Sequence, residues 1–426
     1  MLQQTMKTCY EVFELWQKAA DHVWEEWSAQ PVVVEAMNRN LSVLLAFRKT
    51  YSALASAFGL AASDDFLREF ISASTEFMKI AAKNFVKISG KDLLPRLADT
   101  PCDVVYDEAN MRLLRYRSTT RKYSIPILMV CSLVNRYYIL DLTPGRSLVE
   151  YLLAQGYDVY IIDWGRVTAE EHYYGFEHYD SFIDRSVRKI LQLSRSDQVT
   201  LLGYCIGGLL CTIYAARNSS LIKNLVLMAT PIDFDQAGLI SKWADERYFD
   251  VDALIDTCKV APAELVQTAF VMLKPATNLT KYVNLLKHPN DEAYLRDFLA
   301  LEIWAHDNVS IAGTFYRKLV KDLYQKNKLV RNLFEVGSEK VDLANISMPV
   351  LLVTSSHDHI VPTRSSIALM QRISSQDKEH FEFSAGHISM SVSDAAIVNF
   401  WPKLTKWLST RSHAKQPERK ARGQQR

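Results

Sequence analysis

The sequence predicts an α/β protein with a mainly parallel sheet, and two observations support this prediction. Four short apolar runs rich in Val, Ile and Leu are separated by longer segments with helical periodicity: 127–130, 159–162, 225–228 and 349–354. Continuous apolar runs of this length are typical of strands that are buried on both faces of a parallel sheet. In addition, a cysteine between two glycines joins another such run to a helix-like segment. With 426 residues, 48% of them hydrophobic, the chain can bury a large core.

The run Gly203-Tyr204-Cys205-Ile206-Gly207 has the Gly-x-nucleophile-x-Gly form of the sharp strand-to-helix turn of α/β-hydrolases. Glycines lack a Cβ atom, so the backbone can make this turn and present the side chain that lies between them. Because that side chain is a thiol, we expect thioester chemistry. The turn therefore predicts an α/β-hydrolase fold with Cys205 as its nucleophile.

An acid and a histidine follow Cys205 in the chain order that this fold uses. Asp358 comes just after the apolar run 349–354, and His387 comes just after the strand-like run Phe381–Phe383. In parallel α/β sheets the functional groups gather at the carboxyl ends of the strands, where all three residues are expected. The sequence therefore predicts a catalytic triad of Cys205, Asp358 and His387.

Each predicted site residue has a defined role in acyl transfer. His387 takes the thiol proton, because the thiolate is the nucleophile, and Asp358 orients the imidazole and stabilises its charged form. The backbone N–H groups of Ile206 and Val134 are the predicted oxyanion hole, the second because its loop follows the strand-like run 127–130.

The other histidines and cysteines near these motifs have structural explanations. His357 and His359 flank Asp358, and we expect loop or surface roles for both. Cys211, on the helix after the nucleophile, is expected in the core. The remaining cysteines show no metal-ligand spacing, so we predict no metal site and no cofactor: Cys9, Cys102, Cys131 and Cys258. Without a Cys-x-x-Cys motif or a secretory signal, the cysteines are expected to be reduced, which predicts a cytoplasmic protein.

The chain divides into five predicted segments. Residues 1–98 repeat apolar residues at three- and four-residue steps, which predicts a helical N-terminal extension whose apolar stripes pack on another surface. Residues 99–234 and 331–410 hold the strands of the core. Residues 235–330 interrupt them with helix-like, aromatic-rich stretches, which predicts a lid. Residues 411–426, with six basic and one acidic residue, predict a disordered, solvated tail.

Charge and hydropathy exclude some classes of partner. The formal net charge is only +2, so we expect no nucleic-acid partner beyond an incidental contact of the basic tail with nucleic acid or an anionic surface. No apolar run reaches the roughly 18 to 20 residues of a membrane span, so no such span is predicted.

Several further segments carry a more specific similarity: Ile127–Leu142, Pro144–Leu148, Ile162–Gly165, Gly203–Gly208, Met228–Phe234, Val320–Tyr324, Asp358–Pro362 and Gly386–Ile388. Together they extend over about residues 100–408, and they resemble the polyhydroxyalkanoate synthases. Gly-Tyr-Cys-Ile-Gly-Gly looks like the modified lipase box of that family, in which cysteine is the nucleophile. The resemblance is closest to the short, class III type of catalytic subunit.

The resemblance implies an acyltransferase that polymerises (R)-3-hydroxyacyl-CoA, typically 3-hydroxybutyryl-CoA, into polyester granules. CoA is then the leaving group of the substrate and not a cofactor. The resemblance assigns the acyl chain to Cys205, the activation of that thiol to His387, and help in activating the 3-hydroxyl of the next unit to Asp358. It also implies a homodimer at the granule surface in the cytoplasm, with a separate helical accessory subunit.

About 100 residues precede the predicted core, which departs from the class III pattern. We hypothesise that this extension supplies in cis what the accessory subunit supplies in trans; the alternative is a simple packing extension. Two other functions stay open. The first is a Cys-dependent hydrolase, such as an acyl-CoA thioesterase or a polyester depolymerase, and CoA release without polymer would indicate it. The second is a non-catalytic granule-associated binding protein, which would show no turnover.

Overall fold

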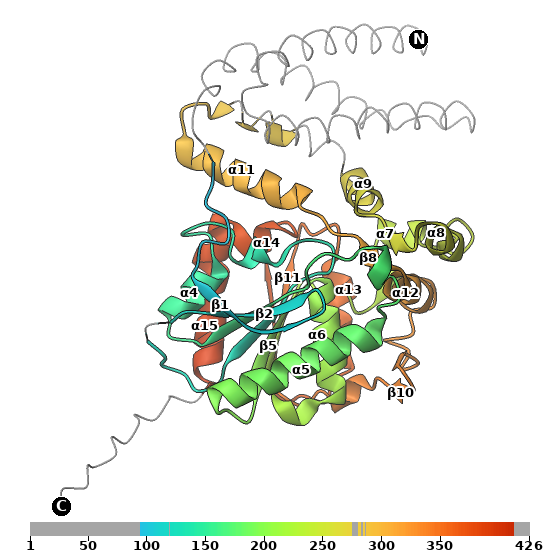
Figure 1. The fold of residues 1–426 in the computed structure, drawn as a ribbon, viewed down its shortest axis with the longest axis horizontal. Helices are drawn as coiled ribbons and strands as arrows, with labels where there is room; N and C mark the ends of the chain where they lie inside the picture. Colours follow the sequence, from blue (N-terminus) through green and yellow to red (C-terminus); the bar gives the residue numbers. More distant parts are fainter. Residues whose placement is uncertain (1–93, 119, 275–279, 283, 286, 413–426) are drawn as a thin grey trace, which may run out of the picture. The chain divides into compact units, whose positions relative to one another are not determined.

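The computed structural model describes five stretches of the chain (Figure 1): residues 94–118, 120–274, 280–282, 284–285 and 287–412. The predicted N-terminal extension up to residue 93 and the predicted basic tail from residue 413 lie outside the described residues. The chain forms two compact units, which are described separately. Among the described residues, the core unit comprises 97–118, 120–263 and 308–412, and the second unit comprises 94–96 and the described part of 264–307.

The core unit is built on an eight-stranded sheet with the strand order β1-β2-β4-β3-β5-β6-β11-β12 (Figure 1). Its strands are β1 (Cys102–Glu108), β2 (Met111–Tyr116), β3 (Ile127–Val130), β4 (Val159–Asp163), β5 (Val199–Tyr204), β6 (Ile222–Met228), β11 (Val350–Ser355) and β12 (Lys378–Phe383). Neighbouring strands from β4 to β12 are parallel, whereas β1 pairs antiparallel with β2, and β2 with β4. The predicted α/β fold is confirmed, and each apolar run singled out in the sequence forms a strand.

Burial explains why these runs are continuous and not alternating. Every residue of β3, β4 and β5 is buried, so both faces of the central strands must be apolar. The edge strand β12 retains exposed residues along its length. The most apolar part of the sequence therefore lies at the centre of the sheet, where Cys205 follows β5.

Helices connect the strands and cover the sheet: α4 (Leu148–Ala154), α5 (Phe176–Ser194), α6 (Ile206–Arg217), α13 (Thr363–Ile367), α14 (Ser389–Val392) and α15 (Trp401–Ser409). The long helix α5 is amphipathic and buries residues at helical spacing, among them Phe176, Ile183 and Ile190. It packs against α6, which contacts β5 and β6. Helix α6 is apolar on nearly all sides because ten of its twelve residues are buried.

The predicted lid segment, 235–330, is largely helical where it is described. In the core unit it contains α7 (Leu239–Trp243), α8 (Val251–Cys258), α12 (Gly313–Lys318) and a π-helical turn over Leu319–Gln325. Four short strands complete this unit: β7 (Val260–Ala261), β8 (Ile311–Ala312), β9 (Glu335–Val336) and β10 (Glu339–Lys340). The lid function and the segment boundaries stay predictions.

The described part of the second unit contains most of α9 (Ala263–Leu273) and α11 (Glu292–His306). It has its own apolar cluster, formed by Tyr282, Leu285, Leu295 and Leu299. In the same unit the buried carboxylate of Glu302 accepts hydrogen bonds from Lys281 Nζ (2.6 Å) and from the Tyr282 hydroxyl (2.8 Å). Pairing of this kind is what a buried carboxylate requires.

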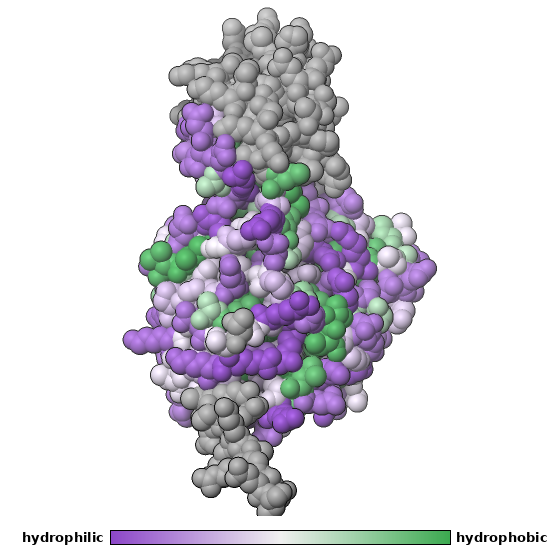
Figure 2. Space-filling view, turned by 60° about the vertical axis from the view of Figure 1, so that its left-hand side comes forward, coloured by the Kyte–Doolittle hydropathy of each residue, from purple (hydrophilic) through white to green (hydrophobic). Residues whose placement is uncertain are grey.

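None of the helices within the described residues is long and apolar enough to cross a bilayer. On the face of the molecule drawn in Figure 2, hydrophilic residues dominate and hydrophobic residues form separate, smaller patches.

Candidate active site

Cys205 makes the turn between β5 and α6 alone, since β5 ends at Tyr204 and α6 begins at Ile206. Its backbone has φ 56° and ψ −124°, a conformation that costs a non-glycine residue about 1–3 kcal/mol. Its N–H donates to the carbonyl of Met228 at the end of β6 (2.9 Å), and this bond holds the turn against the sheet. The strained turn therefore carries the thiol at the carboxyl edge of the parallel strands.

The glycines beside Cys205 are required by close packing. A Cβ atom on Gly203 would lie 2.5 Å from the Cα of Gly208. A Cβ atom on Gly207 would overlap the backbone carbonyl groups of Val130 and Cys131, at the end of β3. Only glycine allows the backbone to approach so closely. The sequence motif thus reflects the contact between the turn and its neighbouring strand.

Asp358 lies in the loop after β11, with its side chain fully buried. Its Oδ1 accepts hydrogen bonds from the N–H groups of Ile360 (2.9 Å) and Val361 (2.8 Å). Its Oδ2 lies 2.6 Å from Nδ1 of His387. All these partners are hydrogen-bond donors, so the buried carboxylate is compensated in its charged form.

His387 links the other two predicted residues. Its Nδ1 contacts Asp358 at 2.6 Å, and its ring lies close enough to Cys205 for that thiol to act on the pKa of the imidazole. Burial by itself lowers the pKa of His387, but the charges and hydrogen bonds of Asp358 and Cys205 outweigh burial and raise it to about 10. The structure therefore brings Cys205, His387 and Asp358 together at one place, and it stabilises the imidazolium form.

Tyr204, the residue before the nucleophile, holds His387 on a second side. The two rings stack with their centroids 5.3 Å apart. The Tyr204 hydroxyl donates to the backbone carbonyl of His387 (3.1 Å). Sequence reasoning missed this contact, because nothing in the motif distinguishes a tyrosine that packs in the core from one that touches a residue 183 positions away.

The two predicted oxyanion donors differ in their surroundings. Ile206 is the first residue of α6, where a backbone N–H has no intrahelical acceptor. The N–H of Val134 donates to the Ser132 hydroxyl at 3.3 Å, and its carbonyl accepts from the N–H of Val309 at 3.0 Å. An oxyanion would have to share the Val134 N–H with Ser132. Both assignments stay predictions.

The structure also shows the surroundings of His357 and Cys211, two residues close to the predicted site in the sequence. Nδ1 of His357 lies 3.3 Å from the hydroxyl of Ser384, which agrees with the expected loop role. Cys211 is fully buried, as expected, and burial raises its thiol pKa. Among the residues that the structure describes, no group of three or more His, Cys, Asp or Glu side chains could hold a metal ion.

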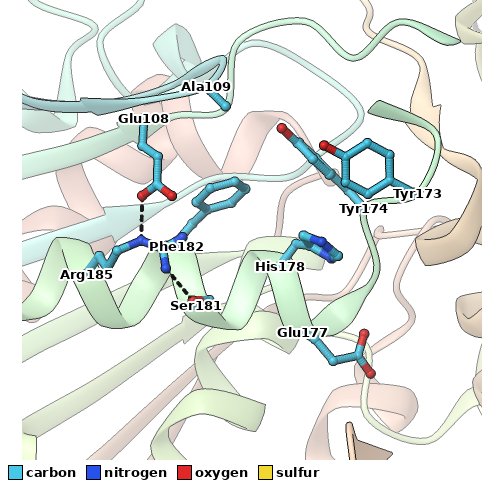
Figure 3. Close-up of a pocket in the computed structure, with 9 residues that line it drawn as sticks. All are labelled: Glu108, Ala109, Tyr173, Tyr174, Glu177, His178, Ser181, Phe182 and Arg185. Atoms are coloured by element: carbon cyan, nitrogen blue, oxygen red, sulfur yellow. Dashed lines mark hydrogen bonds and ion pairs between the residues drawn. The ribbon is translucent and has the colours of Figure 1, made fainter. Parts of the chain in front are cut away.

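A separate pocket of about 430 Å³ lies in the core unit (Figure 3), lined by Glu108, Ala109, Tyr173, Tyr174, Glu177, His178, Ser181, Phe182 and Arg185. Arg185 pairs there with Glu108 (2.5 Å) and donates to Ser181 (2.6 Å), as the dashed lines in Figure 3 mark. None of the three predicted catalytic residues lines this pocket, so it is not the cavity in which a substrate would meet the Cys205 thiol.

Comparison with known proteins identifies the family of this site. Residues 139–394 match the family described as alpha/beta hydrolase fold, and residues 90–152 match the N-terminal part of poly-beta-hydroxybutyrate polymerase (PhaC). The predicted α/β-hydrolase fold is therefore confirmed.

Three relatives are named poly(3-hydroxyalkanoate) polymerase subunit PhaC. The protein from Haloferax mediterranei is 38% identical over 74% of this chain and 64% of its own length. The protein from Synechocystis sp. is 37% identical over 73% of this chain and 85% of its own, and that from Thiocystis violacea is 36% identical over 74% and 89%. The chain therefore belongs to the PhaC family of poly(3-hydroxyalkanoate) polymerase subunits, enzymes on an α/β-hydrolase fold.

Proposed function

We propose that this chain polymerises (R)-3-hydroxyacyl units from their CoA thioesters, with Cys205 as the covalent carrier. The observation that carries the proposal is the position of His387, which pairs with Asp358 (2.6 Å) and lies within the electrostatic reach of Cys205. A base between a nucleophile and an orienting carboxylate is the arrangement that acyl transfer requires.

In the first step, the Cys205 sulfur attacks the thioester carbonyl as a thiolate, with its proton already held by His387 as the imidazolium. The bond from the carbonyl carbon to the CoA sulfur then breaks, and the same proton leaves with CoA. One thioester replaces another, so this step is nearly balanced in free energy. The N–H of Ile206, together with one from the loop after β3, is the proposed donor set for the tetrahedral oxyanion.

In the second step, the 3-hydroxyl of another acyl unit attacks the acyl group on Cys205, and its proton passes to His387. Acylation removes the charge and the hydrogen bond that Cys205 offers to the imidazolium, so the pKa of His387 falls at this stage. A neutral imidazole is then available as the base. A carbon–oxygen ester forms, the carbon–sulfur bond breaks, and the thiol takes the proton back. Since an oxygen ester is more stable than a thioester, this step drives the chain forward.

Asp358 acts on the hydroxyl through His387 in this scheme. Its side chain is fully buried, and both of its oxygens already accept hydrogen bonds from the protein. These contacts support an orienting role and leave no accessible oxygen for a substrate hydroxyl. Cys205 itself is 8% exposed, and such a site limits the access of water to the acyl-enzyme.

The wider assignments belong to the same proposal. We infer a cytoplasmic enzyme at the surface of the polyester granule, active as a homodimer and, in the class III manner, with a helical accessory subunit. The monomer is expected to be 3-hydroxybutyryl-CoA, and CoA leaves as a product, with no cofactor or metal required.

The test uses purified full-length protein with (R)-3-hydroxybutyryl-CoA, following free thiol and the mass of the product, with Cys205→Ala as the control. CoA release with chloroform-soluble polyester, absent in the control, is the expected result. Free 3-hydroxybutyrate in place of polymer would make the chain a thioesterase and overturn the proposal. If CoA is released only after a helical accessory subunit is added, the activity stands and the need for a second subunit is established.

A further inference from the structure

Tyr204 connects the nucleophile to its base by direct contacts. It is the last residue of β5, and Cys205 follows it in the turn, so the strand fixes both residues on one stretch of backbone. Its side chain contacts His387, which lies 183 positions later in the sequence. The proposed mechanism assigns no step to Tyr204, although it touches one of the two residues between which the proton moves and is bonded to the other.

The Tyr204 hydroxyl fixes the backbone that carries His387. It donates to the carbonyl of His387 (3.1 Å). Two residues earlier in the same loop, the carbonyl of Ala385 accepts the backbone N–H of His357 instead (3.1 Å). Burial raises the pKa of the Tyr204 phenol well above its usual value, so the hydroxyl stays protonated and remains a donor. The backbone of His387 is thus held by a side chain from the strand that precedes the nucleophile.

The ring of Tyr204 lies against the imidazole of His387. The ring centroids are 5.3 Å apart, the ring planes differ by 29°, and Tyr204 is buried. The face of a tyrosine ring stabilises a cation within about 6 Å of its centroid, and more strongly where water is excluded. Asp358 contacts a different part of the imidazole, Nδ1 at its edge (2.6 Å). The Tyr204 ring can therefore favour the imidazolium independently of the carboxylate.

The other titratable groups around the thiol keep their charge when Tyr204 is changed. Burial lowers the pKa of His387, and the charges of Asp358 and Cys205 raise it above its ordinary value. Cys131 and Tyr324 also interact with Cys205, but burial raises the pKa of both well above the usual range, so both stay neutral at neutral pH. A change in the thiolate–imidazolium pair on substitution of Tyr204 would therefore come from Tyr204 itself.

We propose that Tyr204 is a positioning residue for acyl transfer: its ring holds the imidazole of His387 beside Cys205 and stabilises the imidazolium that pairs with the thiolate. This inference deepens the proposed function, because the thiolate of that pair carries the acyl group. The bond from sulfur to hydrogen breaks, a bond from the imidazole nitrogen to hydrogen forms, and Tyr204 keeps its own proton. Without the ring the imidazolium is less stable, so the thiolate forms only at a higher pH.

The test compares Tyr204→Leu with Tyr204→Phe. Both variants lose the hydroxyl, so their difference isolates the ring. The matched control is Tyr157→Leu, just before β4 at the opposite edge of the sheet. Tyr157 is fully buried, its ring stacks on Tyr123 (centroids 4.3 Å apart), and its hydroxyl donates to the carbonyl of Thr405 (3.3 Å). Thermal unfolding checks that each variant folds, and Tyr204→Met replaces Tyr204→Leu if the leucine variant does not.

The first readout is the rate of Cys205 alkylation by iodoacetamide as a function of pH, followed on the digested peptide by mass spectrometry. The second is the rate of the CoA burst with (R)-3-hydroxybutyryl-CoA. We expect Tyr204→Phe to keep the pH profile of the wild type and a burst rate within about fivefold of it. Tyr204→Leu should move the profile upward by about half to one pH unit and slow the burst about tenfold relative to Tyr204→Phe.

The control Tyr157→Leu should keep the pH profile of the wild type, although it also loses a buried, stacked ring. Coincident profiles of Tyr204→Leu and Tyr204→Phe, or the same shift in Tyr157→Leu, would overturn the positioning role. Alkylation needs no acyl substrate, so this comparison decides the role of Tyr204 by itself. A wild-type protein that releases free acid in place of polymer would overturn the proposed function alone.

Discussion

Nδ1 of His387 lies 2.6 Å from Oδ2 of Asp358, and the other carboxylate oxygen of Asp358 is held by two backbone N–H groups. Asp358 therefore cannot turn without losing its own partners. Because Nδ1 of the ring is engaged by the carboxylate, Nε2 is the nitrogen left to exchange a proton with Cys205 and with an acyl acceptor. The pair fixes both the orientation and the tautomer of the base.

Replacing Asp358 with Asn removes the carboxylate charge that holds the imidazolium. Burial still lowers the pKa of His387, so we expect that pKa, about 10 in the wild type, to fall in Asp358→Asn. The titration of the His387 ring, followed by NMR, measures this shift. An unchanged pKa would show that the field around His387 does not depend on Asp358.

The raised pKa of His387 beside Asp358 predicts that the stability of the fold depends on pH. The folded-state pKa of His387 is raised above the unfolded value, so its stabilising contribution is present below about pH 6.5 and is lost as the pH rises through about 10. Denaturant unfolding of the wild type and Asp358→Asn across this range checks the sign. The two proteins should differ most at the acidic end of the window, and a difference that grows with pH would contradict the assignment.

The division of roles between the two steps is also testable with Asp358→Asn. If Asp358 acts only through His387, the acylation burst and the elongation rate should fall by similar factors. If Asp358 contacts the acceptor hydroxyl directly, elongation should fall much more than acylation. Rapid-quench measurements of CoA release and chain growth separate these results.

The proposed thiolate mechanism predicts the activities of two variants of Cys205. Cys205→Ala should reduce acyl transfer by about a thousandfold or more and leave the fold intact. Cys205→Ser should also be far below the wild type, because its alkoxide is much harder to form than a thiolate. Polymerisation by the serine variant at a rate near that of the wild type would contradict the thiolate mechanism.

Strain at the turn predicts an effect on stability that is separate from activity. Cys205 has φ 56° and ψ −124°, which glycine adopts without penalty. Cys205→Gly should therefore be more stable than Cys205→Ala by about 1 kcal/mol, measured by denaturant unfolding, although both are inactive. Equal stabilities would mean that the turn stores no strain.

Close packing at Gly207 predicts that a larger residue there lowers the stability of the fold. An added methyl group would overlap the carbonyl groups of Val130 and Cys131, so Gly207→Ala should lower the unfolding free energy by about 1–3 kcal/mol. Gly386→Ala is the matched control, because its Cβ would meet only Ser389 Oγ, at an ordinary 3.8 Å. The control should lie within about 0.5 kcal/mol of the wild type.

The fold and the triad are readable in the sequence because each depends on local signals. Strands buried on both faces need continuous apolar runs, as in β3 and β5, and the strained turn at Cys205 needs glycines on either side. Loops after strands of a parallel sheet meet at one edge, which places Asp358 and His387 in one predicted site.

Contacts between distant segments could not be predicted in this way. The hydrogen bond from the Val134 N–H to Ser132 depends on the exact path of a loop, and the stacking of Tyr204 on His387 depends on side-chain packing. The ring of Tyr324 packs on Phe234 only because a π-helical turn and the loop after β6 meet there. Periodicity and spacing carry no signal for any of these three relationships.

The most direct test of the account is the site of the acyl group. The wild-type protein is mixed with one equivalent of (R)-3-hydroxybutyryl-CoA, quenched in acid, digested and analysed by mass spectrometry. We predict a 3-hydroxybutyryl thioester on the peptide that contains Cys205, absent in Cys205→Ala. Release of CoA with an unmodified Cys205 peptide at every time of quenching would contradict covalent transfer through this residue.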